Sequence, residues 1–339
     1  MPARPHSSVT AVDKVFGKHS VRAVLLARPD SITRLLLGGK ESYHRDMIEL
    51  ARRSGDPRAL VEVGAADFRA RPRSTWSGRQ FTLDRPLFGQ ALEAAQALGD
   101  PAWLATAQAH AAFCAFIAGD SENLRTLTAA LGRTAAGGQN QVALRFHLLL
   151  SQTLATLEGR LDDAEALSAE ASDVRRTTGI AQSDAVGAIA QLSLRREQDR
   201  MAELIPALTT DDTSRPPAGA AAAVEAFALV ESGYRDDAAI LLHRAGHAAF
   251  NDVPDDVDWP VAVALWSEVA AHVGDRHAAA ELVEILRPHD GIQMCSGGAG
   301  CGPASRLLAI QEMLLGRPAD ADRHFAEAIA FSREFSSPV

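Results

Sequence analysis

The sequence has few aromatic residues and few cysteines. Phenylalanine, tryptophan and tyrosine account for only 5% of its 339 residues, although hydrophobic residues reach 47%. A composition rich in alanine and leucine but poor in aromatics favours closely packed helices over a β-sandwich. The three cysteines, Cys114, Cys295 and Cys301, are too sparse and odd in number for a disulfide scaffold, and they fit a reducing cytoplasm.

Long apolar segments are missing as well. No run approaches the ~20 apolar residues that a membrane-spanning helix requires. The first residues, MPARPHSSVTAVDK, contain no apolar stretch that would serve as a signal peptide. The sequence therefore predicts a cytoplasmic protein without a membrane partner, and it predicts that residues 1–14 form a disordered tail.

Charge is distributed unevenly along the chain. The whole sequence has 34 lysines and arginines against 43 aspartates and glutamates, a net charge of −9. Residues 1–80 hold 15 basic and 8 acidic residues, a net of +7, so the remaining residues carry −16. A basic segment of this kind suits either an acidic partner such as nucleic acid or the acidic remainder of its own chain.

One spacing of small and large apolar residues recurs along most of the chain. In the segment GRPADADRHFAEAIAFS, Gly316 is followed by Ala321, Phe325 and Ala328, which fall on one face of a helix. Alanine lets a neighbouring helix approach closely, and phenylalanine fills the space beside it. Earlier turns repeat the first part of this spacing: Gly119 with Leu124, Gly159 with Ala164, Gly233 with Ala238, and Gly274 with Ala279.

The repeated spacing has a regular period. Gln198-Asp199 stands where another glycine is due, and successive turns are then 35 to 42 residues apart. Such a period indicates a stacked array of helix pairs, because one pair cannot bury its own apolar stripe. The spacing resembles the second helix of a tetratricopeptide repeat (TPR). We therefore predict a mainly α fold, with a TPR-like superhelix of antiparallel helix pairs over residues 81–335.

A second resemblance concerns the same part of the chain. Residues 85–332 resemble the helical C-terminal region of large LuxR-type regulators and of ATPase modules linked to nucleotide cyclases. The matching residues are Asp258-Trp259, the segment from Ala271 to Gly274, the loop Gly297-Gly298-Ala299 and the final repeat. The resemblance implies a regulatory protein. Since helical arrays offer extended concave surfaces, we expect a non-catalytic protein that binds a protein, a peptide or a small effector.

Residues 15–80 form a basic segment with two alternative interpretations. In the first, residues 15–71 resemble the substrate-binding domain of SpoU-type (TrmH-like) RNA 2′-O-ribose methyltransferases. The residues that carry this resemblance are Gly17-Lys18-His19-Ser20-Val21, Arg28-Pro29, Ile32 and Leu35–Leu37. It implies a small α/β module in which Ile32–Leu37 and Leu60–Val63 are strands. The expected RNA contacts are Lys14, Lys18, Arg22, Arg28 and Arg34.

The motifs that bind the methyl donor in those enzymes are not found in this sequence, so the first interpretation gives an RNA-binding adaptor. The second interpretation makes Tyr43 to Asp56 an ordinary repeat helix. Its end, SGDP at residues 54–57, echoes LGDP at residues 98–101, and glycine followed by proline is a helix stop signal. Strands between residues 43 and 71 would support the RNA module, whereas continuous helix would support a longer array.

Candidate chemical groups are few, and we expect no catalytic residue, no cofactor and no metal. The glycine-rich string from Cys295 to Cys301 lacks a surrounding βαβ unit, so we interpret it as a flexible loop with two free thiols. His243 and His247 share a helix face but lack further ligands. The acidic residues Asp255, Asp256 and Asp258 precede Trp259-Pro260 and are interpreted as a helix cap.

Overall fold

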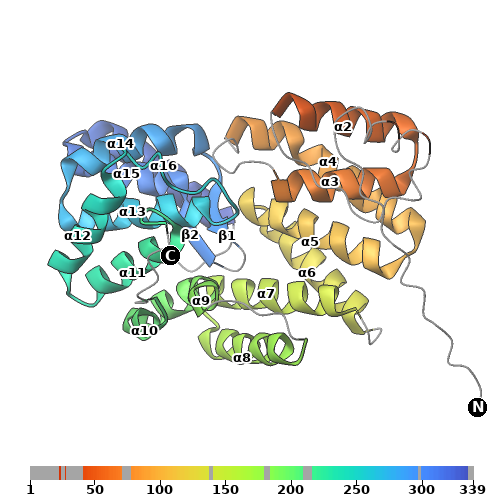
Figure 1. Ribbon diagram of the computed structural model, residues 1–339, viewed down its shortest axis with the longest axis horizontal. Helices are drawn as coiled ribbons and strands as arrows, with labels where there is room; N and C mark the ends of the chain where they lie inside the picture. Colours follow the sequence, from red (N-terminus) through yellow and green to blue (C-terminus); the bar gives the residue numbers. More distant parts are fainter. Residues whose placement is uncertain are drawn as a thin grey trace, which may run out of the picture.

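The fold is mainly α, as the sequence predicts. The computed structural model describes residues 41–70, 78–136, 140–178, 184–208, 216–296 and 299–334, together with Ala23 and Ala27. Helices fill most of these ranges, and one short hairpin is the only sheet among them (Figure 1). None of the helices in the described ranges is both long and apolar enough to cross a bilayer.

Three helices come first in the described part of the chain. They are α2 (Glu41–Ser54), α3 (Pro57–Ala70) and α4 (Gly78–Leu98). Met47 and Ala51 on α2 pack with Ala59 and Val63 on α3 and with Leu87 on α4, and all five are buried.

The expectation that Leu60–Val63 is a strand is wrong, because this run lies within α3. Short apolar runs do not distinguish a strand from a buried helix. Here the helix prevails because Asp56 Oδ1 accepts a hydrogen bond from the Arg58 amide at 2.8 Å, and α3 is buried between α2 and α4. Helices thus fill most of the described part of residues 43–71, where the two interpretations differ. This favours the second interpretation, in which Tyr43 to Asp56 is an ordinary repeat helix. Ile32–Leu37 and the five expected RNA contacts lie outside the described residues.

Helix pairs make up most of the described residues from Pro101 onward. In each pair a first helix belongs to an inner layer, and a second helix packs behind it. The pairs are α5 (Pro101–Ile117) with α6 (Ser121–Ala136), α7 (Gln141–Leu157) with α8 (Leu161–Thr178), α9 (Asp184–Glu197) with the short η3 (Met201–Leu204) and α10 (Ile205–Leu208), α11 (Ala220–Glu231) with α12 (Arg235–Gly246), α13 (Trp259–Val273) with α14 (Arg276–Leu286), and α15 (Ala304–Leu315) with α16 (Pro318–Glu334).

The turn inside each pair has the same backbone conformation. Positive φ angles occur at Gly119, Gly159, Gly233, Gly274 and Gly316, and at Asp199 with φ 56°, where the sequence lacks the glycine. The residue five positions after each turn is buried against the first helix: Leu124, Ala164, Leu204, Ala238, Ala279 and Ala321. In the last repeat Ala328 is also buried, but Phe325 is only half-buried and His324 beside it is 6% exposed.

Arginines connect successive repeats. Arg235 at the start of α12 donates to the Val273 carbonyl at the end of α13, at 2.7 Å. Arg276 at the start of α14 donates to the carbonyls of Leu314 and Leu315 at the end of α15, at 2.6 and 2.9 Å. These carbonyls have no partner inside their own helix, so each arginine caps the first helix of the next repeat.

A β-hairpin separates α14 from α15. After the short η4 (Arg287–His289), β1 (Gln293–Ser296) pairs antiparallel with β2 (Ala299–Pro303), with Cys295 opposite Gly300. The expectation of a flexible inter-repeat loop is therefore wrong for the described residues of this string. The reason is burial, because Cys295 and Cys301 are 8% and 3% exposed.

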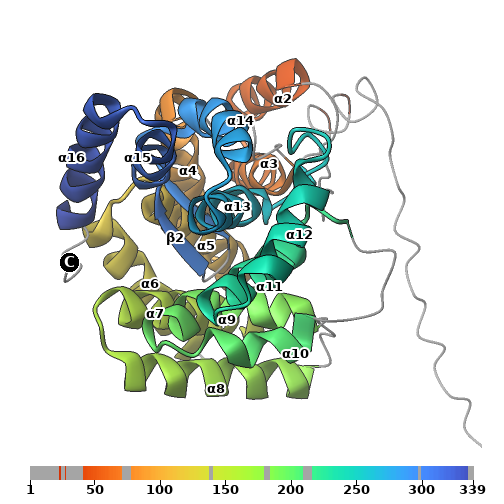
Figure 2. The ribbon, with the colours of Figure 1, turned by 90° about the vertical axis from the view of Figure 1, so that its left-hand side faces the viewer.

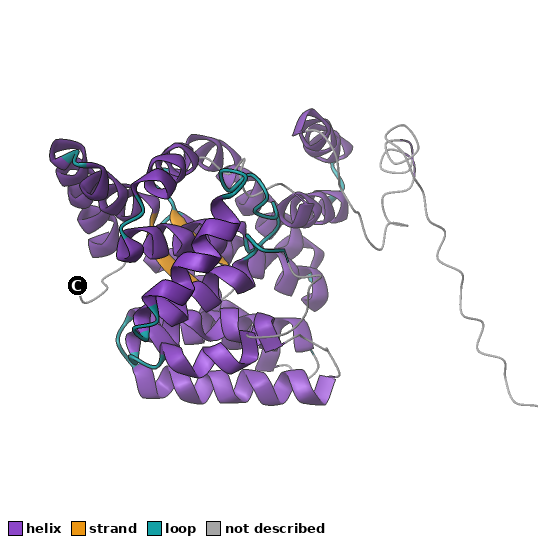
Figure 3. Ribbon diagram, turned by 60° about the vertical axis from the view of Figure 1, so that its left-hand side comes forward, coloured by secondary structure: helices purple, strands orange, loops and turns teal. Residues whose placement is uncertain are grey.

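The hairpin lies between two apolar cores. Ile292 and Cys295 pack into the core of α5, α6 and α7, whereas Met294, Ala299 and Cys301 pack into the core of α9 to α15. Figure 2 shows β2 in the middle of the helices, and Figure 3 shows both strands enclosed by them. Phe331 on α16 returns to the α5–α6 turn, so the array closes around its own hairpin.

Candidate functional site

A buried carboxylate holds two arginines beside the hairpin. Glu268 on α13 is 4% exposed and is the one charged residue between Val261 and Ala270, where every residue is buried. Nη2 of Arg196 on α9 donates to Glu268 Oε1 at 3.1 Å, and Nη2 of Arg306 on α15 donates to the same oxygen. Side chains from three repeats therefore meet at one oxygen atom, and we call Arg196, Glu268 and Arg306 the central arginine site.

The two arginines keep the buried carboxylate of this site ionised at neutral pH. Burial alone would raise the pKa of Glu268, but Arg306 and Arg196 outweigh burial and hold that pKa below its usual value. Burial would also lower the pKa of Arg196, yet Glu268 and other nearby groups raise it. The Arg196 guanidinium lies 5.1 Å from the centroid of the Phe227 ring, a favourable cation–π position. Two positive charges thus face one negative charge.

The two arginine side chains remain partly accessible. Arg196 and Arg306 expose 30% and 27% of their side chains. A guanidinium has five N–H donors. Among the described contacts, Arg196 donates to Glu268 alone, while Arg306 donates to Glu268 and to the Cys301 carbonyl at 3.0 Å. The arrangement can accept one more acidic group, a carboxylate or a phosphate, on the remaining donors.

Inner-layer side chains hold the hairpin backbone in place. The Gly300 amide donates to Ser193 Oγ at 2.7 Å, and the Ser193 hydroxyl donates to the Gly300 carbonyl at 3.0 Å. A Cβ at Gly300 would lie 3.0 Å from Phe116 Cζ, so any other residue there would force the Phe116 ring on α5 to shift. The hairpin thereby fixes Cys301, whose carbonyl accepts from Arg306.

The cysteines are unsuited to catalysis. Cys114, Cys295 and Cys301 form no disulfide, and all three are buried. Burial raises the pKa of the Cys301 thiol to about 12, despite the two arginines that lower it. Since the thiolate is the reactive form, Cys301 is inert at neutral pH.

Other residues singled out in the sequence are dispersed. His243 exposes 72% of its side chain, with Nδ1 3.9 Å from Asp275 Oδ2, and His247 lies at the end of α12. Asp256 accepts from the Asp258 amide at 2.9 Å. Asp258 occupies the N-cap position of α13 but makes no side-chain cap hydrogen bond, and its carboxylate accepts from the Ser296 hydroxyl instead.

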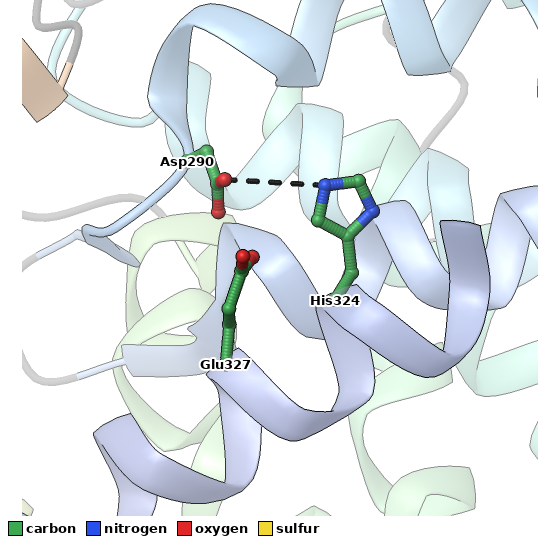
Figure 4. Close-up of side chains that lie close together, drawn as sticks. All are labelled: Asp290, His324 and Glu327. Atoms are coloured by element: carbon green, nitrogen blue, oxygen red, sulfur yellow. Dashed lines mark ion pairs between the residues drawn. The ribbon is translucent and has the colours of Figure 1, made fainter. Parts of the chain in front are cut away.

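A second cluster contains groups that could hold a metal. Asp290 precedes the hairpin, and His324 and Glu327 lie on α16 with their ligand atoms all within 4.8 Å of one another (Figure 4). We expected no metal from the sequence and named none of these three residues. The one sequence signal for the cluster is the three-residue spacing of His324 and Glu327, which places both on one helix face.

Comparisons with known proteins add no assignment. No protein-family model matches the chain, and no curated protein matches it with significance.

Proposed function

We propose that the chain is a non-catalytic helical-repeat regulatory protein that binds a protein, a peptide or a small effector through an acidic group. The observation that carries this proposal is the central arginine site. Its two guanidinium groups face a single carboxylate, and the two arginine side chains are partly exposed. Charge-assisted hydrogen bonds from arginine to carboxylate or phosphate are strong and directional, which suits recognition of such a group.

The position of the site explains how binding would act on the fold. Arg196, Glu268 and Arg306 belong to α9, α13 and α15, and Arg306 also holds the hairpin through the Cys301 carbonyl. A ligand on both guanidinium groups would join repeats that are distant in sequence. It would therefore stabilise the array around the hairpin, and this stabilisation is the basis of the proposed regulation.

The experiment compares the intact chain with Arg306→Lys. Lysine keeps the positive charge but loses the planar fork of donors, so we expect the bound acidic ligand to be lost while the fold is retained. Arg323→Lys on the exposed face of α16 is the matched control. Affinity capture would identify bound proteins, peptides and RNA, and citrate and pyrophosphate would serve as probes in thermal-shift assays.

Two outcomes decide the proposal. Ligand binding that Arg306→Lys weakens and Arg323→Lys does not would support it. Equal binding by all three proteins would contradict it. The alternative function, an RNA-binding adaptor, depends on the basic residues near the N-terminus. RNA capture that survives Arg306→Lys would favour that alternative, although α2 and α3 do not form the α/β order that it implies.

A further inference from the structure

We infer that Asp290, His324 and Glu327 form a zinc-binding site that fastens the last helix to the base of the hairpin. This inference is independent of the proposed function, because it uses none of the residues of the central arginine site. Asp290 lies between η4 and β1, whereas His324 and Glu327 project from α16 (Figure 4). A metal bound by all three would connect the segment before β1 with α16, since Asp290 and His324 are 34 positions apart in the sequence.

The histidine is already oriented for a metal. Its Nδ1 lies 2.6 Å from Glu312 Oε2 on α15, and the His324 and Glu312 side chains are only 8% and 6% exposed. A histidine that binds a metal through Nε2 donates its Nδ1–H to a neighbouring acceptor, and Glu312 Oε2 lies where that acceptor is needed. Nε2 is the nitrogen on the side of Asp290. A carboxylate behind the other ring nitrogen is the usual partner of a metal-bound histidine.

The two carboxylates face this free nitrogen. Asp290 Oδ2 lies 4.0 Å from His324 Nε2, and the three ligand atoms lie within 4.8 Å of one another. Zinc bonds of about 2.0–2.2 Å in tetrahedral geometry need ligand atoms about 3.4 Å apart. The ligands must therefore close by roughly 1 Å. Asp290 and Glu327 expose 36% and 45% of their side chains, so both carboxylates are able to move that far.

The local charge also favours a divalent cation. Asp290, Glu327 and Glu312 surround one histidine, and Arg323 on α16 balances one of these three negative charges, with its Nη1 3.9 Å from Glu327 Oε1. A mixed set of one imidazole and two carboxylates suits zinc better than magnesium, which prefers oxygen ligands and retains its waters. Three protein ligands leave a fourth zinc position for water.

The test measures zinc binding to the full-length, tag-free protein after removal of metal with a chelator. Titration calorimetry with zinc chloride should give one ion per chain, and magnesium chloride at the same concentration should not compete. Asp290→Asn and Glu327→Gln should each weaken zinc binding by at least tenfold. Their side chains are partly exposed, so both variants should fold, as circular dichroism would verify.

The chain supplies its own control for this site. His243 and His247 lie one turn apart on α12 and offer an alternative place for zinc. His243→Gln should leave the affinity unchanged. Zinc should also raise the melting temperature of the wild type more than that of Glu327→Gln, since the metal binds the folded state. Absence of binding, or binding that His243→Gln removes and Glu327→Gln does not, would overturn the inference.

Discussion

Replacement of Gly119 by alanine tests whether the array closes on itself. Gly119 lies in the α5–α6 turn with φ 76°, and a Cβ there would be 2.7 Å from Phe331 Cζ on α16. Real Cβ atoms do not approach other atoms so closely, so the backbone or the ring must shift. The variant would therefore carry two costs, one from the backbone conformation and one from the clash with the last helix.

The two costs can be separated with a matched glycine. Gly233 has φ 88° in the equivalent turn of another repeat, and a Cβ there would meet no atom within 4 Å beyond its two neighbours in the chain. Gly233→Ala should lower the free energy of unfolding by about 1–2 kcal/mol through the left-handed backbone alone. Gly119→Ala adds an overpacking cost of about 1–3 kcal/mol, giving a total of about 2–5 kcal/mol.

Urea unfolding followed by circular dichroism would measure these differences. Phe331→Leu shortens the side chain that the new methyl group meets, so the double variant Gly119→Ala with Phe331→Leu should lose less than the sum of the single variants. Equal destabilisation by Gly119→Ala and Gly233→Ala, with additive effects in the double variant, would show that α16 does not pack on the first repeat.

The mainly helical fold was predictable because its signals are local. The turn glycine and the small residue five positions later lie within one repeat, and both reflect the backbone of one turn and the crossing of two adjacent helices. The pattern even located Asp199, which takes the same positive φ without being glycine. The strand that the first interpretation implies at Leu60–Val63 is not formed, because three apolar residues around Glu62 are too few to show a periodicity, and neighbouring helices decide their conformation.

The hairpin was not predictable for the opposite reason. Its glycines indicate a loop when only the local sequence is considered, because glycine weakens a strand that has no supporting contacts. The contacts that stabilise it come from far away, since Ser193 and Gly300 are 107 positions apart. No period of 35 to 45 residues specifies such a pair.

The candidate sites were hidden in the same way. Arg196 and Arg306 lie 72 and 38 positions from Glu268, and each is an ordinary arginine near the end or the start of a helix. Only the stacking of α9, α13 and α15 brings their charges together. Asp290 likewise belongs to a candidate site only because α16 packs beside it, and the hairpin and α15 separate the two in the sequence.

Two further predictions concern the last repeat and the buried carboxylate. Ala321 is fully buried, so Ala321→Leu should lower the free energy of unfolding by about 1–3 kcal/mol through overpacking, whereas Ala319→Leu on the exposed side of α16 should not. An unchanged urea midpoint for Ala321→Leu would contradict the assigned repeat register. Glu268→Gln should cost about 3–5 kcal/mol at pH 7, because it leaves two partly buried guanidinium groups facing each other. The pKa of Glu268 lies below its ordinary value of 4.5 in the folded protein. Its ionised form therefore contributes stability that is complete above the unfolded pKa and is lost as the pH falls through the folded value. Below about pH 4.5 the wild type should accordingly lose stability faster than Glu268→Gln. The two unfolding free energies should converge in acid, and a difference that stays constant from pH 7 down to the acid limit of the folded state would refute the ionic role of Glu268.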